Sequence, residues 1–127
     1  MIGIVIPEGI TAIGKSAFTY CRSLEAVTIP DSVRSIDDHA FDGCERLTEV
    51  TVPSGVQSIG TAAFQNCRGL YTITIPDSVN EMGKSILASC RSLSAIHFGG
   101  TVDKWHSLFS GNSLFVTVHC VDGNTET

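Results

Sequence analysis

The segment LEAVTIPDSVRSIDDHAFDGC at residues 24–44 decides the fold, because a close copy of it begins at Leu47. The copy reads LTEVTVPSGVQSIGTAAFQNC and occupies residues 47–67. The same 23-residue step separates the members of several residue columns along the chain. Four of these columns are Cys21, Cys44, Cys67 and Cys90; Pro7, Pro30, Pro53 and Pro76; Phe18, Phe41, Phe64 and Leu87; and Leu24, Leu47, Leu70 and Leu93. Columns that keep phase over four periods predict a solenoid of stacked turns.

Each turn is predicted to contain one short strand. In residues 24–30 the apolar residues are Leu24, Val27 and Ile29, and the Val-Thr-Ile alternation is typical of a strand with one face turned inward. Pro30 ends the strand because it has no N–H to donate to a ladder. Since the unit repeats in one direction, successive strands must lie parallel to one another.

The second half of each turn has helical spacing. Ile36, Ala40, Phe41 and Cys44 are four, one and three residues apart, which predicts one or two turns of helix. The residue before each cysteine is expected to form a left-handed cap, and these residues are Tyr20, Gly43, Asn66 and Ser89. A turn with positive φ is also expected just after the Ile36 column, at Gly14, Asp37, Gly60 and Gly83.

These columns resemble the leucine-rich repeats, and closely the BspA-like (Treponema-type) class, whose unit has the form L-x-x-V-x-I-P-x-x-V-x-x-I-G-x-x-A-F-x-x-C. The resemblance implies an α/β solenoid, a leucine-rich-repeat right-handed superhelix with a parallel β-sheet on the concave face. It further implies one short strand per 23-residue turn and short helical or 3-10 segments on the convex side. We therefore expect residues 1–120 to form a single leucine-rich-repeat domain of about five turns.

The last turn departs from the pattern, which predicts a C-terminal capping turn at residues 98–120. Trp105 is expected to close the open end of the core, because terminal repeats must be atypical. The next strand fits if the step is one residue shorter than the regular period. The Leu93, Ile96 and Phe98 columns are then continued by Phe115, Val118 and Cys120. Residues 121–127 are predicted to be a polar tail.

The N-terminus shows no such cap. Met1 falls on the Leu24 column, which leaves an unpaired strand edge and an apolar repeat end in water. Two hypotheses follow from this pattern. Either the chain is the C-terminal part of a longer repeat array, or strand 1–6 pairs with another copy in a homodimer.

Composition limits the classes of partner. The net charge is −5, and the eight Lys and Arg residues are spread along the chain, whereas nucleic-acid binding needs a basic patch. No apolar stretch reaches the roughly 18 residues that a bilayer span requires. The start MIGIVIPEGI has neither the basic residues nor the cleavage site of a signal peptide. We expect no nucleic-acid partner and no membrane insertion.

The cysteine column is interpreted as packing. Structural zinc sites need cysteines a few residues apart whose thiolates converge, whereas a repeat column stacks its side chains in parallel about 4.8 Å apart. Parallel side chains also lack the opposed Cβ vectors of a disulfide. Cys is therefore expected to act as a small hydrophobe between turns.

The histidines are not part of a catalytic set. His39 lies beside Asp37 and Asp38, but its column otherwise holds Ser and Ala, so it is interpreted as a solvated surface residue. His97 and His119 fall at outward positions of consecutive strands, where adjacent imidazoles can bind a metal or sense pH, but a third ligand is missing. No nucleophile, base and orienting residue occur at a known catalytic spacing. We expect no enzyme activity, no cofactor and no metal site.

The concave face is where solenoids usually bind their partners. Its outward columns are small, rich in hydroxyl groups and mildly acidic, with one aromatic residue. The candidate binding residues are Glu25, Thr28, Glu49, Thr51, Tyr71, Thr72, Thr74 and His97. A threonine ladder is also what β-propensity alone would select on a solvated face, so an inert surface is the alternative.

The resemblance carries an expectation about function as well. BspA-like proteins include surface adhesins that attach to host extracellular-matrix proteins. The chain is therefore expected to be a non-catalytic protein–protein interaction module of a secreted or cell-surface protein, with a protein ligand. One alternative is a structural spacer that displays other domains and binds nothing itself. Another is a redox or metal protein that uses the thiols.

Overall fold

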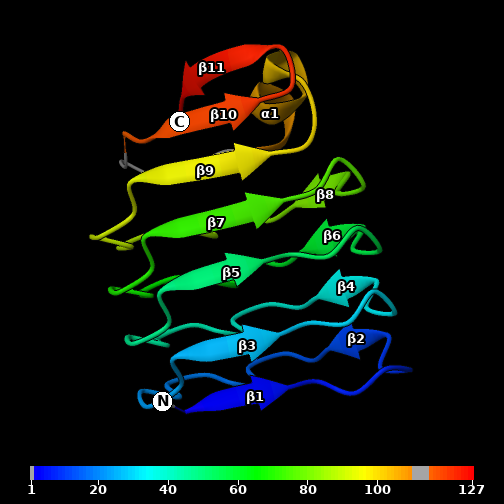
Figure 1. Ribbon diagram of the computed structural model, residues 1–127, viewed down its shortest axis with the longest axis vertical. Helices are drawn as coiled ribbons and strands as arrows, with labels where there is room; N and C mark the ends of the chain where they lie inside the picture. The colour runs from blue at the N-terminus through cyan, green and yellow to red at the C-terminus, as the bar shows by residue number, and fades with distance from the viewer. Residues whose placement is uncertain (1, 110–114) are drawn as a thin grey trace.

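The computed structural model describes residues 2–109 and 115–127, which form a parallel β-solenoid (Figure 1). Six strands follow one another along one side, and their outward surface, here called the strand face, corresponds to the expected concave face. These strands are β1 (Gly3–Val5), β3 (Ala26–Thr28), β5 (Glu49–Thr51), β7 (Thr72–Ile75), β9 (Ala95–Phe98) and β10 (Thr117–Cys120). The first five of them begin at equivalent positions of successive turns, which confirms the predicted period. Met1, placed on the Leu24 column by its spacing, lies outside the described residues.

A second parallel sheet, which the sequence pattern does not predict, runs along another side of the solenoid (Figure 1). It consists of β2 (Ala12–Ile13), β4 (Ser35–Ile36), β6 (Ser58–Ile59) and β8 (Glu81–Met82). Ile36 therefore pairs with Ile59 in a strand and does not begin a helix. The chain turns between Ile36 and Ala40, where the Ala40 N–H donates to the Asp37 carbonyl oxygen. The four-residue spacing thus buries both side chains without a helix.

Hydrogen-bonded turns take the place of the short helical or 3-10 segments expected on the outer arc. In the arc of residues 37–44 the backbone of His39 is left-handed, with φ 56°, and this interrupts a right-handed helix. The N–H groups of alternate residues then donate to the next turn instead of along a helix axis. These bonds join His39 to Thr61, Phe41 to Ala63 and Gly43 to Gln65, at 2.9, 2.8 and 2.8 Å. The arc is therefore a ladder between turns.

Left-handed backbone is confirmed at the residue before each of the four cysteines of the repeat column. The φ angles are 56° at Tyr20, 80° at Gly43, 58° at Asn66 and 61° at Ser89. A second left-handed column was not predicted. It consists of Ser16, His39, Ala62 and Ser85.

The expected positive φ at Gly14, Asp37, Gly60 and Gly83 is wrong, because none of these residues has one. Close packing between turns explains two of the glycines. A Cβ atom would lie 2.5 Å from the Asp38 nitrogen at Gly60 and 2.3 Å from the Thr61 nitrogen at Gly83. These positions need glycine for space and not for backbone conformation.

The core is a stack of similar layers. The ring centroids of Phe18, Phe41 and Phe64 lie 5.2 and 5.3 Å apart, and the rings are nearly parallel. The inward residues of the strands are buried beside them: Val50, Ile73 and Ile96 are at most 2% exposed. Each layer therefore covers the apolar surface of the layer before it.

The cysteines lie in the same stack, and the packing interpretation is confirmed for three of them. Cys44, Cys67 and Cys90 are fully buried, whereas Cys21 is half-buried. Each buried thiol donates a hydrogen bond to the carbonyl oxygen of a phenylalanine in the preceding turn. The acceptors are Phe18, Phe41 and Phe64, at 3.2, 3.2 and 3.1 Å. Burial raises the pKa of the Cys44 thiol to about 12, so this group stays neutral at physiological pH.

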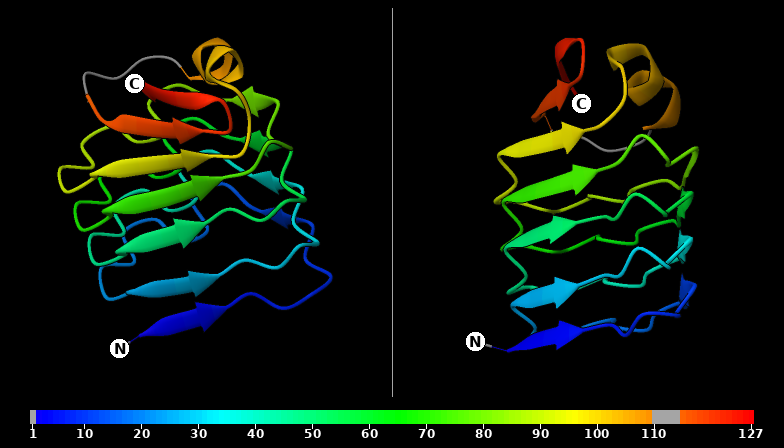
Figure 2. Two further views of the ribbon diagram at one scale, coloured as in Figure 1. Left: turned by 45° about the horizontal axis from the view of Figure 1, so that its top comes forward. Right: turned by 45° about the vertical axis from the view of Figure 1, so that its right-hand side comes forward.

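The C-terminal turn closes the core as expected. Figure 2 shows α1 (Val102–Leu108) lying over the last turns of the solenoid. Trp105 is fully buried, and its ring centroid lies 5.4 Å from that of Phe98 and 4.7 Å from that of Phe109. Among the described residues, no helix has the length and apolar character that crossing a membrane requires.

The strand after α1 confirms the shortened step, because Val118 pairs with Ile96. The assignment of Phe115 to the Leu93 column is wrong. Phe115 is 86% exposed, and Val116 is buried in its place. Both residues precede β10, so the strand alternation does not fix their orientation.

Residues 121–127 are not the polar tail that the sequence predicts. They form a turn and then β11 (Gly123–Glu126), which pairs antiparallel with β10. The His106 Nε2 atom lies 2.8 Å from the Thr125 hydroxyl oxygen and links this strand to α1. The side chains are polar, but the backbone supplies the last strand of the sheet and covers the edge of β10.

Replacement of Gly43 tests the left-handed arc. In Gly43→Ala the new Cβ would lie 2.3 Å from the Tyr20 ring on a backbone with φ 80°. We expect a loss of about 1–3 kcal/mol in the free energy of unfolding, measured by urea titration with circular dichroism. Gly14→Ala is the matched control, because no atom lies within 4 Å and φ is not positive, so we expect little change. Equal stabilities for the two variants would contradict this account.

The Cys44 thiol is expected to make stability fall at alkaline pH. Its pKa of about 12 in the folded chain lies above the ordinary 9.0, so its contribution is complete below pH 9 and disappears as the pH rises towards 12. Between pH 8 and pH 10 the wild type should lose about 1 kcal/mol more unfolding free energy than Cys44→Ala. Urea titrations at both pH values measure this difference, and identical pH dependences would refute the assignment.

Candidate interaction surface

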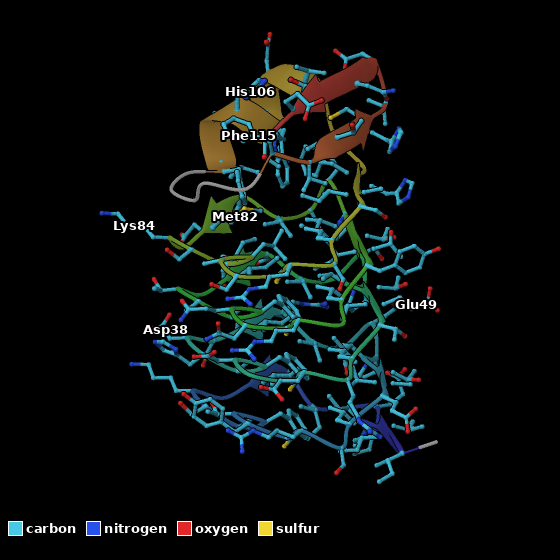
Figure 3. All side chains as sticks on the ribbon, turned by 90° about the vertical axis from the view of Figure 1, so that its left-hand side faces the viewer. Asp38, Glu49, Met82, Lys84, His106 and Phe115 are labelled. Atoms are coloured by element: carbon cyan, nitrogen blue, oxygen red, sulfur yellow. The ribbon has the colours of Figure 1, made fainter. Side chains whose placement is uncertain are left out.

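Six of the eight candidate binding residues form two rows at equivalent positions of successive strands, while Glu25 and Tyr71 lie just before β3 and β7. Thr51 pairs with Thr74 and Thr74 with His97, which form one row with Thr28. Glu49 and Thr72 form the neighbouring row. Figure 3 shows the Glu49 side chain on the side of the molecule opposite to Asp38 and Lys84. Glu49, Thr51 and Thr74 are exposed beside the buried Val50 and Ile73, so these three positions face outward.

The exposure of the candidates differs. Thr28, Glu49, Thr51, Thr74 and His97 are exposed, and Tyr71 is 57% exposed just before β7. Two candidates, Glu25 and Thr72, are less exposed than the others. The Glu25 carboxylate accepts a hydrogen bond from the Ile2 N–H at 3.2 Å. The Thr72 hydroxyl oxygen is buried and has no hydrogen-bond partner among the described residues.

The strands that form the strand face are not paired between β3 and β5. β1 and β3 form one sheet, and β5, β7, β9, β10 and β11 form another. The other strands of the same two turns, β4 and β6, remain paired. Val27 of β3 is only half-buried, whereas Val50, its counterpart in β5, is 2% exposed. The two turns are therefore separated on the side of the strand face and remain paired on the side of the second sheet.

A groove of about 640 Å³ lies at this interruption. Thr28, Glu49 and Thr51, three of the predicted binding residues, line it. The remaining lining residues are Ala26, Val27, Ile29, Asp31, Val52, Pro53, Ser54 and Pro76. The aliphatic and proline side chains provide apolar surface, while Asp31 and Glu49 bring negative charge. No Lys or Arg of the described residues lines the groove, so it favours a partner with apolar and basic groups.

Two further hollows lie away from the candidates. One of about 640 Å³ lies along β4, β6 and β8, and its lining includes Asp38, Glu81 and Lys15. The other, of about 300 Å³, lies at the N-terminal end and is lined almost wholly by apolar residues, among them Val5 and Phe18. The apolar repeat end expected from the sequence is therefore present in the structure.

The side chains that could bind a metal are not clustered in the described parts of the chain. Among residues 2–109 and 115–127, no three His, Cys, Asp or Glu side chains are grouped closely enough to hold a metal ion. His39 does not join Asp37 and Asp38. Its Nδ1 atom instead lies 2.9 Å from the Asp42 carboxylate, which is buried below it, and half of the His39 side chain is exposed.

A stack of 23-residue turns, with a strand on one side and apolar columns inside, defines a leucine-rich-repeat solenoid. The family profile described as BspA type leucine-rich repeat region matches residues 1–115 in six copies. The chain belongs to this family, and the resemblance carried by its columns is confirmed. Proteins built from such repeats are typically non-catalytic, and these repeats are typical of protein-interaction or surface modules.

Three solved structures are similar to this chain. A leucine-rich cell surface protein from Faecalibacterium prausnitzii is 24% identical, with a TM-score of 0.74 over 88% of this chain and 36% of that one. A leucine-rich repeat protein from T. pallidum is 26% identical, with a TM-score of 0.64 over 76% and 58%. A leucine-rich repeat protein from Bacteroides ovatus is 29% identical, with a TM-score of 0.60 over 94% and 38%.

The chain therefore spans between 36% and 58% of the length of these three proteins. No curated protein matches it.

Proposed function

We propose that this chain is a non-catalytic protein-interaction module that binds a protein ligand at the groove between β3 and β5. The observation that carries the proposal is the interruption of an otherwise regular sheet. It opens a groove of about 640 Å³ on the face where three predicted binding residues already lie. Ligand sites are commonly concave and largely apolar, with a few placed polar groups, and this groove has that composition.

The charge of the groove favours one kind of ligand. Asp31 and Glu49 line it without a cation among the described lining residues, and the whole chain carries a net charge of −5. A ligand segment with a Lys or Arg beside apolar side chains would satisfy the carboxylates and cover the apolar surface. We propose that the ligand is a host or extracellular-matrix protein, and that the chain acts as part of a secreted or cell-surface adhesin. The family and the cell-surface protein among its structural relatives support this placement.

A structural spacer is the second candidate function. The repeated threonines Thr28, Thr51 and Thr74 suit a solvated strand without any ligand. Binding hot spots favour Trp, Tyr and Arg, and Tyr71 is the one residue of these types among the predicted binding residues. This composition favours a surface without a ligand. A rigid stack of turns with a plain surface would then hold other domains apart.

Binding to purified extracellular-matrix proteins, measured by surface plasmon resonance, separates the two functions. Glu49→Lys reverses a charge in the groove, and we expect it to weaken binding about tenfold or more. Tyr71→Ala tests the exposed aromatic on the same face and should weaken binding as well. Glu81→Lys is the matched control, because it makes the same charge change on β8, outside the strand face, and should bind like the wild type.

Two outcomes of this experiment would contradict a ligand site at the groove. Failure of the wild type to bind any matrix protein favours the spacer. Equal losses for Glu49→Lys and Glu81→Lys indicate a non-specific charge effect and not a site at the groove.

We also propose that strand 1–6 can contact a second copy of the chain. Val5 is 75% exposed and Ile2 is 53% exposed, beside the apolar hollow at the N-terminal end. β1 pairs on one side only, with β3, and so presents an open strand edge among the described residues. Sedimentation velocity should show a dimer whose fraction rises with concentration and which Val5→Lys removes. A wild-type chain that stays monomeric at all concentrations contradicts this contact.

A further inference from the structure

Two histidines lie side by side at the C-terminal end of the strand face. His97 is in β9 and His119 is in β10, and the two residues are direct partners in the parallel register. Their ring centroids are 5.0 Å apart, and the ring planes differ by 16°. The shortened last turn creates this pair, because the regular step from His97 would reach Cys120 instead of His119.

The third strand of this region orients one of the rings. β11 lies against β10 (Figure 1), and Asn124 is the antiparallel partner of His119. The Asn124 side-chain oxygen lies 3.1 Å from His119 Nδ1. An amide oxygen can only accept a hydrogen bond, so this contact requires a proton on Nδ1 of His119. In the neutral ring the lone pair then lies on Nε2, which is the atom left for a metal ion.

The surroundings of the pair suit a cation. His97 is exposed and His119 is half-buried, so neither residue is enclosed in the core. The nearest strand neighbours on this face are Thr74, the partner of His97 in β7, together with Ala95 and Thr117. None of these three residues carries a positive charge that would repel a metal ion.

We propose that His97 and His119 bind a divalent transition-metal ion through two imidazole nitrogens, with water at the remaining positions. Imidazole is a preferred ligand of nickel, copper and zinc. Two nitrogens at about 2.1 Å from one tetrahedral ion are separated by roughly 3.4 Å, so the two rings must turn out of their stacked arrangement to direct both lone pairs at the ion. The sequence alone offers no third protein ligand, and this site does not need one. It lies on β9 and β10, apart from the groove between β3 and β5, and does not depend on the function proposed for that groove.

The other imidazoles already have hydrogen-bond partners. His39 Nδ1 lies beside the Asp42 carboxylate, and His106 Nε2 lies beside the Thr125 hydroxyl. Cys120 adjoins His119 in sequence but faces the opposite side of β10 and packs against the core. These residues therefore serve as controls for the site.

Isothermal titration of the full chain with NiCl₂, under conditions that keep the thiols reduced, tests the proposal. We expect one Ni²⁺ per chain, and an association constant at least tenfold lower in both His97→Thr and His119→Thr. Thr is the residue at the equivalent positions of β3, β5 and β7, so His97→Thr should fold normally. Asn124→Ala should weaken binding several-fold, because the His119 ring loses its orienting partner.

His39→Ser is the matched control, because Ser occupies the same column at Ser16 and Ser85, and its affinity should equal that of the wild type. Cys120→Ser should also bind like the wild type. The proposal is overturned if the wild type binds no Ni²⁺ or if His97→Thr retains full affinity. It is also overturned if His39→Ser or Cys120→Ser removes the binding, since another side chain would then be the ligand.

Discussion

Backbone hydrogen bonds from each turn to the next hold this molecule together, because a single turn cannot bury its own apolar side chains. They run on three sides of the solenoid. The Val52 N–H donates to Thr74 in the first sheet, Gly60 N–H to Ile36 in the second, and Phe41 N–H to Ala63 in the outer arc. Adjacent turns are thereby held about one strand spacing apart, roughly 4.8 Å.

This spacing explains the uniformity of the core. A buried side chain packs on the equivalent side chain of the turn below and is covered by that of the turn above, so the members of a column have similar shapes. The phenylalanine rings stack at 5.2 and 5.3 Å for this reason. The buried cysteines follow the same constraint, because a small side chain fits there and its thiol also satisfies a phenylalanine carbonyl oxygen.

The surface becomes distinctive where the repeat is broken. The missing strand pairing between β3 and β5 converts a regular face into a groove with two carboxylates. The last turn, one residue shorter, brings His119 beside His97 and leaves β10 to be covered by β11. Both candidate sites thus arise from departures from the regular period, because identical turns can only present identical rows.

The sequence by itself determined the period, the parallel strands, the burial of Cys44 and the closure of the core by Trp105. Columns in phase report which side chains face inward, and burial is what such a pattern encodes. Only the tertiary structure decided which backbone groups bond to one another. The left-handed column of Ser16, His39, Ala62 and Ser85, the second sheet and the glycines Gly60 and Gly83 depend on atoms of the neighbouring turn, a full period away along the chain. Spacing placed His97 and His119 at outward positions of consecutive strands, but β11 and the interruption between β3 and β5 could not be predicted from it, because a column fixes the direction of a side chain and not its partner.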